Sequence, residues 1–192
     1  MEIEDCLILI DFETTCEANG RLTRDEMEII EIGAVKIDKV TGEILDEFSS
    51  FVRPVNNPRL STFCSALTGI RQTDIDSAAS FQEVLANWKD WLGHPFWTYA
   101  SWGEFDRTIL ERCLLEMGEE FIFDNHINLK ARAKSSFGLK KSGLAETLRY
   151  LGLGFEGRHH RALDDVLNIA KILPHLGIDD DPGKSKPHGE QS

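Results

Sequence analysis

The sequence predicts a single α/β domain whose sheet is mixed or parallel, and three observations support this. The run Leu-Ile-Leu-Ile at residues 7–10 is apolar throughout, as in a strand buried on both faces. Two further strand patterns, residues 29–37 and 44–52, flank a Thr41-Gly42 turn and predict a meander. The length of 192 residues suits one such domain with a sizeable core.

The other elements follow from capping signals and periodicity. Ser80-Phe81-Gln82-Glu83 matches a capping box and opens a helix whose apolar stripe we assign to the core. Residues 96–101 are a fourth strand, followed by a helix that begins near Asp106. The remaining predictions are a loop at 16–24, a short helical or looped segment at 60–70, a fifth strand with a helix at 122–136, a helix at 142–151, and a last helix with an apolar stripe at Ala162, Val166, Ile169 and Leu173.

Composition limits the classes of protein. No apolar run approaches the ~20 residues of a membrane span, the first five residues are acidic, and the four cysteines form no C-x-x-C pair. We therefore expect a cytoplasmic protein with free thiols and no membrane contact. We expect residues 1–178 to form the domain and residues 179–192 to be a disordered tail. The net charge of −12 argues against a broad nucleic-acid surface, but an enzyme that grips a few nucleotides in one cleft is still compatible with it.

Two carboxylates stand at the end of the first strand. Because strand side chains alternate, Asp11 and Glu13 point to one face and Phe12 to the other. Two acids so placed repel each other unless a cation lies between them, and carboxylate oxygens suit Mg²⁺. The alternative is that the strand has reached solvent and both acids are hydrated.

A third acid, Asp106, falls on the buried side of its helix, because Ile109 and Leu110 follow it by three and four residues. An acid in that position is unusual. Stabilisation by the amides of the first helical turn is the structural alternative to a functional role.

The last helix carries a fourth acid. Asp165 falls on its apolar stripe, whereas Asp164 aligns with Asn168 on the solvent face. His160 lies five residues before Asp165, in the loop that enters the helix, and we take its neighbour His159 as solvated. Four acids in one site would need cations, and two divalent ions would suit hydrolysis of a phosphodiester with His160 as general base. Spacing alone does not establish that the four acids converge.

The order Asp-x-Glu-Thr at residues 11–14, Phe-Asp at 105–106 and His-x-x-x-x-Asp at 160–165 resembles the DEDDh superfamily of 3′-5′ exonucleases. The resemblance covers residues 5 to 176. It implies a ribonuclease-H-like fold, which is a mixed five-stranded sheet flanked by helices. Within the superfamily, residues 8–16, residues 58–70 and Gly157-Arg158-x-His160 are similar to the Eri-type 3′ exoribonucleases, which trim structured or double-stranded RNAs.

This resemblance implies a metal-dependent exoribonuclease that acts on RNA 3′ ends, single-stranded or in short overhangs, and releases nucleoside 5′-monophosphates. It implies two Mg²⁺ ions, with Mn²⁺ as an alternative. Asp11, Glu13 and Asp165 would bind the first ion, Asp11 would also reach the second, Asp106 would act through water, and His160 would be the base. The aromatic rings of Phe63 and Phe105 would stack on the terminal base, with the backbone at Thr14 near the terminal sugar. Core packing is the alternative for both rings.

Phe105 stands where some members of the family have Trp directly before the third acid, and Trp102 lies three residues earlier. Two other functions stay open. One is the same chemistry on DNA ends, since recognition of the 2′-hydroxyl depends on contacts that sequence does not reveal. The other is a non-catalytic RNA-binding scaffold, against which the full set of four acids and a histidine argues.

Overall fold

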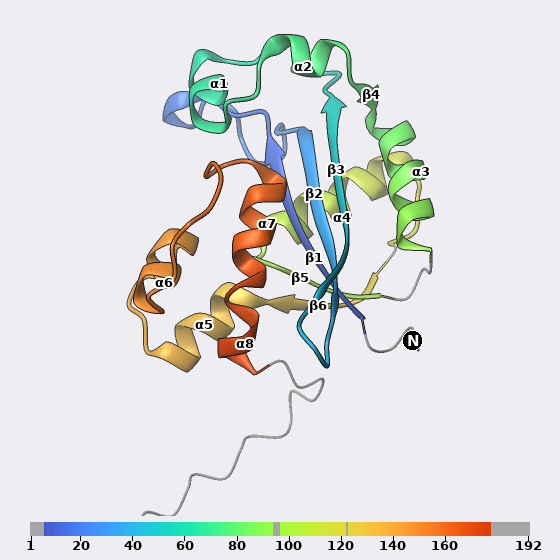
Figure 1. Cartoon of the computed structure of the whole chain (residues 1–192). Coiled ribbons are helices and arrows are strands. Elements are labelled where there is room, and N and C mark those ends of the chain that lie inside the picture. The colour runs from blue at the N-terminus through green and yellow to red at the C-terminus, as the bar shows by residue number, and fades with distance from the viewer. Residues whose placement is uncertain (1–5, 94–96, 122, 178–192) are drawn as a thin grey trace, which may run out of the picture.

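The structure is a computed structural model that describes residues 6–93, 97–121 and 123–177. Helices cover both faces of a central twisted sheet, and the long strands β1, β2 and β3 run side by side through its middle (Figure 1). The expected tail at residues 179–192 lies outside the described residues. None of the helices in the described ranges is long and apolar enough to span a membrane.

The sheet is mixed, as expected, but it has six strands in the order β4-β3-β2-β1-β5-β6 where five were predicted. β1 pairs antiparallel with β2 and parallel with β5, so it lies near the centre. The additional strand, β4, is only two residues long and pairs parallel with the end of β3. The prediction missed it because Ser80, the second of its two residues, is also the N-cap of the next helix. The strands are β1 Cys6–Thr14, β2 Ile29–Asp38, β3 Ile44–Arg53, β4 Ala79–Ser80, β5 Trp97–Ser101 and β6 Phe123–Asn128.

Side-chain alternation in β1 separates two cores. Ile8, Ile10 and Phe12 pack under α3 (Phe81–Leu92) and α4 (Phe105–Met117). Leu7 and Leu9 face the opposite side, which is covered by α5 (Leu129–Phe137), α6 (Leu144–Tyr150) and α7 (Ala162–Ala170). The odd-numbered side chains of β1 therefore point toward α7, as the alternation predicted for the two acids at its end.

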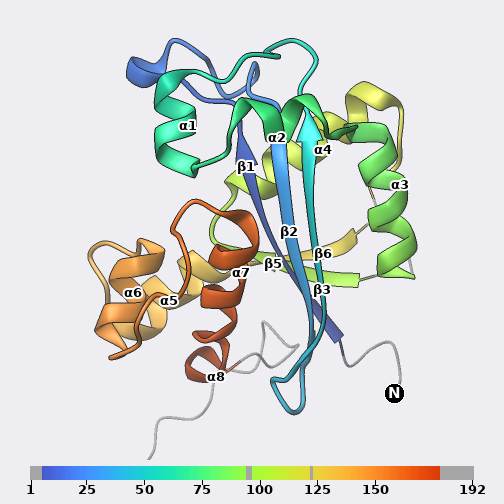
Figure 2. The same ribbon diagram turned by 45° about the horizontal axis from the view of Figure 1, so that its top comes forward.

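Two short helices lie at the end of the sheet where β1 stops (Figure 2). α1 (Thr62–Thr68) begins after Ser61, whose hydroxyl accepts the backbone N–H of Cys64, and ends at Gly69, which adopts a left-handed conformation. α2 (Gln72–Asp76) was not predicted from the sequence. The capping box that opens α3 is present, with both reciprocal bonds between Ser80 and Glu83.

Two expectations for the last helix are wrong. α7 ends at Ala170, and a separate helix α8 (Leu173–Leu176) follows, because Pro174 cannot continue the hydrogen-bond ladder of α7. Asn168, assigned to the solvent face, is fully buried. Its amide bonds the backbone N–H and carbonyl of Glu156 and the carbonyl of Asp164, so it holds the preceding loop against the helix.

Candidate active site

The end of β1 supplies Asp11 and Glu13. In the ladder with β2, Asp11 lies opposite Gly33 and Glu13 lies opposite Glu31. Glu13 is buried, with 8% of its surface exposed. Burial, followed by the charges of Asp165 and Glu31, raises the pKa of Glu13 to about 9. Burial and the charge of Asp106 raise the pKa of Asp11 well above its ordinary value. This strand end therefore carries two acids that resist ionisation unless a cation is present.

α7 brings Asp165 to the same place because β2 has no side chain at Gly33. A Cβ at Gly33 would lie 2.3 Å from the backbone carbon of Ala162, so only glycine lets the first turn of α7 approach β2 so closely. Asp165 is 4% exposed, and burial raises its pKa to about 7. Ligand oxygens of Asp11, Glu13 and Asp165 all lie within 4.8 Å of one another.

Asp106 is buried at the first turn of α4, as predicted. Its Oδ1 accepts the backbone N–H of Phe12 at 3.1 Å, a contact that fixes α4 to the end of β1. The carboxylate of Asp106 therefore bonds a partner on β1, outside its own helix. Burial raises the pKa of Asp106 to about 6. Asp106 lines the same cavity as the other three acids but is not in the group whose ligand atoms lie within 4.8 Å.

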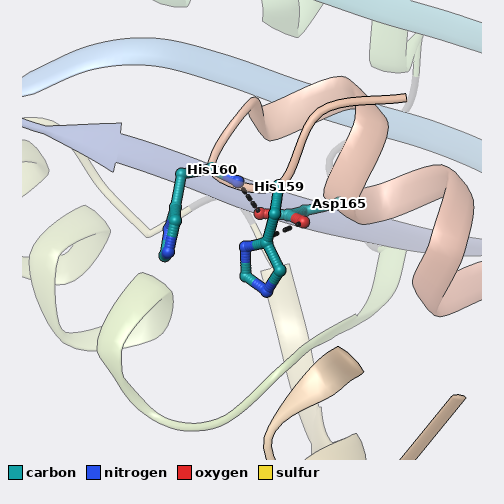
Figure 3. A group of neighbouring side chains, drawn as sticks. All are labelled: His159, His160 and Asp165. Atoms are coloured by element: carbon teal, nitrogen blue, oxygen red, sulfur yellow. Dashed lines mark hydrogen bonds and ion pairs between the residues drawn. The ribbon is translucent and has the colours of Figure 1, made fainter. Parts of the chain in front are cut away.

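His160 enters the site through an unusual backbone conformation. It is the one non-glycine residue with positive φ among the described residues, at 65°, and its backbone N–H donates to Asp165 Oδ2 at 3.0 Å. The contact drawn from His159 to Asp165 runs instead from the ring, with Nδ1 at 3.7 Å from Oδ1 (Figure 3). His159 also stacks on Phe155. His159 is exposed, as expected for a solvated neighbour, but it also lines the site through these ring contacts.

These groups line a cavity of about 510 Å³. Of the residues predicted to bind the substrate, some line this cavity and one does not. Thr14 and Phe105 line it, and the guanidinium of Arg24 lies 5.8 Å from the centre of the Phe105 ring. Phe63 does not line it. Its ring is 44% exposed on α1, one turn before Leu67, which does line the cavity. Core packing is thereby excluded for Phe63, whereas Phe105 both packs against the core and faces the cavity.

Comparison with known proteins identifies the family. The RNase_T family model, described as Exonuclease, matches residues 8–173. The solved nuclease domain of 3′hExo, described as a DEDDh family member bound to rAMP, superimposes with a TM-score of 0.79 at 31% identity over 88% of this chain and 90% of that domain. This chain belongs to the DEDDh exonuclease family. The superposition also establishes the ribonuclease-H-like fold expected from the motifs.

Two curated relatives place the chain within this family. It is 32% identical to ERI1 exoribonuclease 2 of Xenopus laevis over 90% of its own length and 28% of the frog protein. It is 34% identical to 3′-5′ exoribonuclease 1 of Homo sapiens over 90% of its length and 52% of the human protein. The chain thus spans between about a quarter and half of these relatives.

The DEDDh family depends on divalent metals, and the residues of this chain fit such a requirement. Asp165 Oδ1 is buried and has no hydrogen-bond partner among the described residues. A buried carboxylate oxygen left without a partner is costly, and a cation held by the neighbouring Asp11 and Glu13 would satisfy it. The three acids supply oxygen atoms, which are the donors that hard divalent cations take.

Sequence reasoning missed Glu31 and Arg161. Glu31 is 1% exposed, and its carboxylate accepts the Arg161 guanidinium at 2.8 and 3.1 Å and the Ala162 backbone N–H at 3.1 Å. It therefore anchors the start of α7 on β2. A usable signal was Gly33, since an isolated glycine within a strand often marks close approach of another backbone.

Proposed function

We propose that this chain is a metal-dependent 3′-5′ exoribonuclease that releases nucleoside 5′-monophosphates from RNA 3′ ends. The observation that carries the proposal is the convergence of Asp11, Glu13 and Asp165 within 4.8 Å at one end of the sheet. The two relatives described above are both named as exoribonucleases, which supports RNA as the substrate. The rAMP bound to the 3′hExo domain supports a ribonucleotide as the ligand of this chain.

In this proposal Asp11, Glu13 and Asp165 hold one divalent ion, and Asp11 together with Asp106 serves a second. The ions are Mg²⁺, with Mn²⁺ as an alternative. When bound, they would offset the charge of the acids and stabilise the charge that develops on the phosphodiester oxygens. The contact from Asp106 to the Phe12 backbone at 3.1 Å keeps that carboxylate directed at the end of β1.

His160 is the proposed general base. One of its ring nitrogens lies within 4.8 Å of an Asp165 carboxylate oxygen, and burial together with the positive charge of His159 lowers the pKa of His160. A lowered pKa keeps the ring neutral at pH 7, which is the form able to take a proton from water on a ring nitrogen. The backbone bond from His160 to Asp165 holds the loop in the position that this requires.

The terminal nucleotide would occupy the cavity of about 510 Å³. Phe105 offers a face for the base, because it is half-buried and lines the cavity, while Thr14 lies beside the acids. Phe63 would contact the nucleotide from the rim, since the side chain stands one helical turn from Leu67. Stacking on aromatic rings is worth about 1–3 kcal/mol per base and tolerates any sequence.

The test uses 5′-labelled RNA and DNA oligomers of one sequence with Mg²⁺ or Mn²⁺, and EDTA as the metal-free control. Wild-type protein should shorten RNA from the 3′ end and release mononucleotides. Asp165→Asn, which preserves the shape of the side chain, should abolish release, whereas Asp90→Asn on the exposed face of α3 should not. Faster degradation of DNA would favour a DNA exonuclease. RNA binding with no turnover under either metal would favour a scaffold.

A further inference from the structure

Positive charge in this acidic chain is concentrated in one segment. Residues 125–145 contain five Lys or Arg and no Asp or Glu, although the whole chain has a net charge of −12. Four of the five are exposed lysines, on α5 and in the loop that follows it, and we call these four the α5 strip. They are Lys130, Lys134, Lys140 and Lys141. The strip is thus a positively charged region on a molecule whose net charge is negative.

The lysines of the α5 strip are not neutralised by neighbouring acids. Some surface cations elsewhere are paired, as Lys89 is with Glu119 at 2.6 Å. Across the described parts of the chain, no lysine of the strip forms an ion pair within 4.0 Å. Their charge therefore remains available to an anion from solution.

The strip adjoins the active-site cavity. Lys130 and Lys134, one helical turn apart on one face of α5, line a second cavity of about 390 Å³. This second cavity and the active-site cavity share three lining residues, which are Arg24, Trp102 and Phe105. A polymer whose end occupies the first cavity would pass directly into the second.

The second cavity contains one acid, Glu104, whose charge is already engaged. Its Oε1 accepts Asn128 Nδ2 at 2.7 Å, and its Oε2 lies 3.7 Å from the guanidinium of Arg107. The side of the cavity formed by α5 thus keeps its positive charge. The indole N–H of Trp102 donates to the Ser142 carbonyl at 3.0 Å, which fixes this ring between the two cavities.

We propose that the α5 strip binds the phosphates of the RNA strand on the 5′ side of the scissile bond, with Lys130 and Lys134 closest to the active site. This inference rests on the proposed exoribonuclease function. Binding by the α5 strip explains how a protein with a net charge of −12 binds RNA, since a few unpaired lysines beside the site suffice to bind a polyanion. Lysines contact phosphates as point charges, so this binding would not depend on the base sequence of the RNA.

The experiment compares Lys130→Gln/Lys134→Gln with a control that removes the same charge elsewhere, Lys39→Gln/Lys89→Gln. The turn between β2 and β3, which contains Lys39, lies at the opposite end of the sheet from α1 and α2 (Figure 1). Lys89 lies on α3. Hydrolysis is measured on a dinucleotide, which fills only the terminal cavity, and on a 12-nucleotide RNA. Affinity for the same 12-nucleotide RNA is measured by fluorescence anisotropy in EDTA at several salt concentrations.

Lys130→Gln/Lys134→Gln should bind the 12-nucleotide RNA more weakly and raise its KM several-fold, while kcat and KM for the dinucleotide stay at wild-type values. The slope of log affinity against log salt should become shallower by about 1.4, as expected for two lost contacts to a single strand. The control should match wild type in all of these measurements.

Equal behaviour of the two double variants on the 12-nucleotide RNA would overturn the inference, and so would an equal loss on the dinucleotide. Failure of the proposed function is distinguishable, because it would appear as absence of hydrolysis by the wild-type protein. The affinity and salt slope in EDTA would still decide whether the α5 strip binds RNA.

Discussion

Glu31 lies directly opposite Glu13 in the ladder between β1 and β2, so two buried carboxylates face each other beside the site. Arg161 offsets the charge of Glu31 with three hydrogen bonds from its guanidinium, of which the shortest is 2.8 Å. Glu13 has no comparable cation among the described side chains. The arrangement neutralises the acid that anchors α7 and leaves the acid at the site available to a metal.

Arg161→Ala should destabilise the protein by about 3 kcal/mol, because it leaves Glu31 buried and unpaired opposite Glu13. The measurement is urea unfolding in EDTA. Arg161→Ala/Glu31→Gln should recover most of this loss, since the double variant carries no orphaned charge and the introduced glutamine side chain retains an acceptor for the Ala162 N–H. A double variant no more stable than Arg161→Ala would contradict the assignment of Arg161 as the partner that neutralises Glu31.

Gly33→Ala should lower the melting temperature and abolish nucleotide release. The added Cβ would lie 2.3 Å from the Ala162 backbone, which no side-chain rotation can relieve, so α7 must move away from β2 and carry Asp165 with it. Thermal unfolding and the oligomer assay together provide the measurement. Gly154→Ala is the matched control, because a Cβ at that position meets no atom within 4 Å. If both variants behave alike, close packing at Gly33 does not position the site.

The sequence predicted the faces of elements well because alternation and helical spacing are local properties. The odd positions of β1 do face α7, and Asp106 and Asp165 do lie on buried sides of their helices. Contacts between distant residues were not predictable in this way. Glu31 and Arg161 are 130 residues apart, and although Gly33 signals a close approach of some backbone to β2, nothing in the sequence identifies Arg161 as the partner of Glu31.

Asn168 illustrates a second limit of prediction from sequence. A polar residue on an amphipathic helix is normally assigned to solvent, but this amide is buried because the loop at Glu156 folds over it and satisfies its hydrogen bonds. The position of Phe63 outside the cavity lining depends likewise on how α1 packs at the end of β1, and the local sequence of Phe63 does not encode that placement.

Without metal, the free energy of unfolding should fall as pH rises from about 4.5 to about 9. Burial raises the pKa of Glu13 from 4.5 to about 9 and that of Asp165 from 3.8 to about 7. In this range the folded state therefore holds protons that the unfolded state has released, and stability is lost as pH passes upward toward the folded pKa values. Urea unfolding in EDTA between pH 5 and pH 9 measures this, and Glu13→Gln should flatten the upper part of the curve.

Divalent metal should reverse this fall in the free energy of unfolding. The effect should be strongest at high pH, because the acids of the site must ionise to bind the metal. A metal at 100 times its Kd adds about 2.7 kcal/mol to the free energy of unfolding. The stabilisation by Mn²⁺ should therefore be larger at pH 8 than at pH 5.5, and Asp165→Asn should remove most of it. Stabilisation of equal size at both pH values would contradict a site made of these acids.

The pH dependence of kcat at saturating metal should report the protonation of the His160 ring. Burial and the positive charge of His159 lower the pKa of His160, so the base stays neutral, and activity persists, below the ordinary histidine value of about 6.5. His159→Gln removes the neighbouring positive charge, so the pKa of His160 should rise and the acid limb should move to higher pH. His175→Gln, on the exposed side of α8, should leave the limb where it is. If the acid limb is unchanged in His160→Asn, the limb belongs to another group, and His160 is not the base.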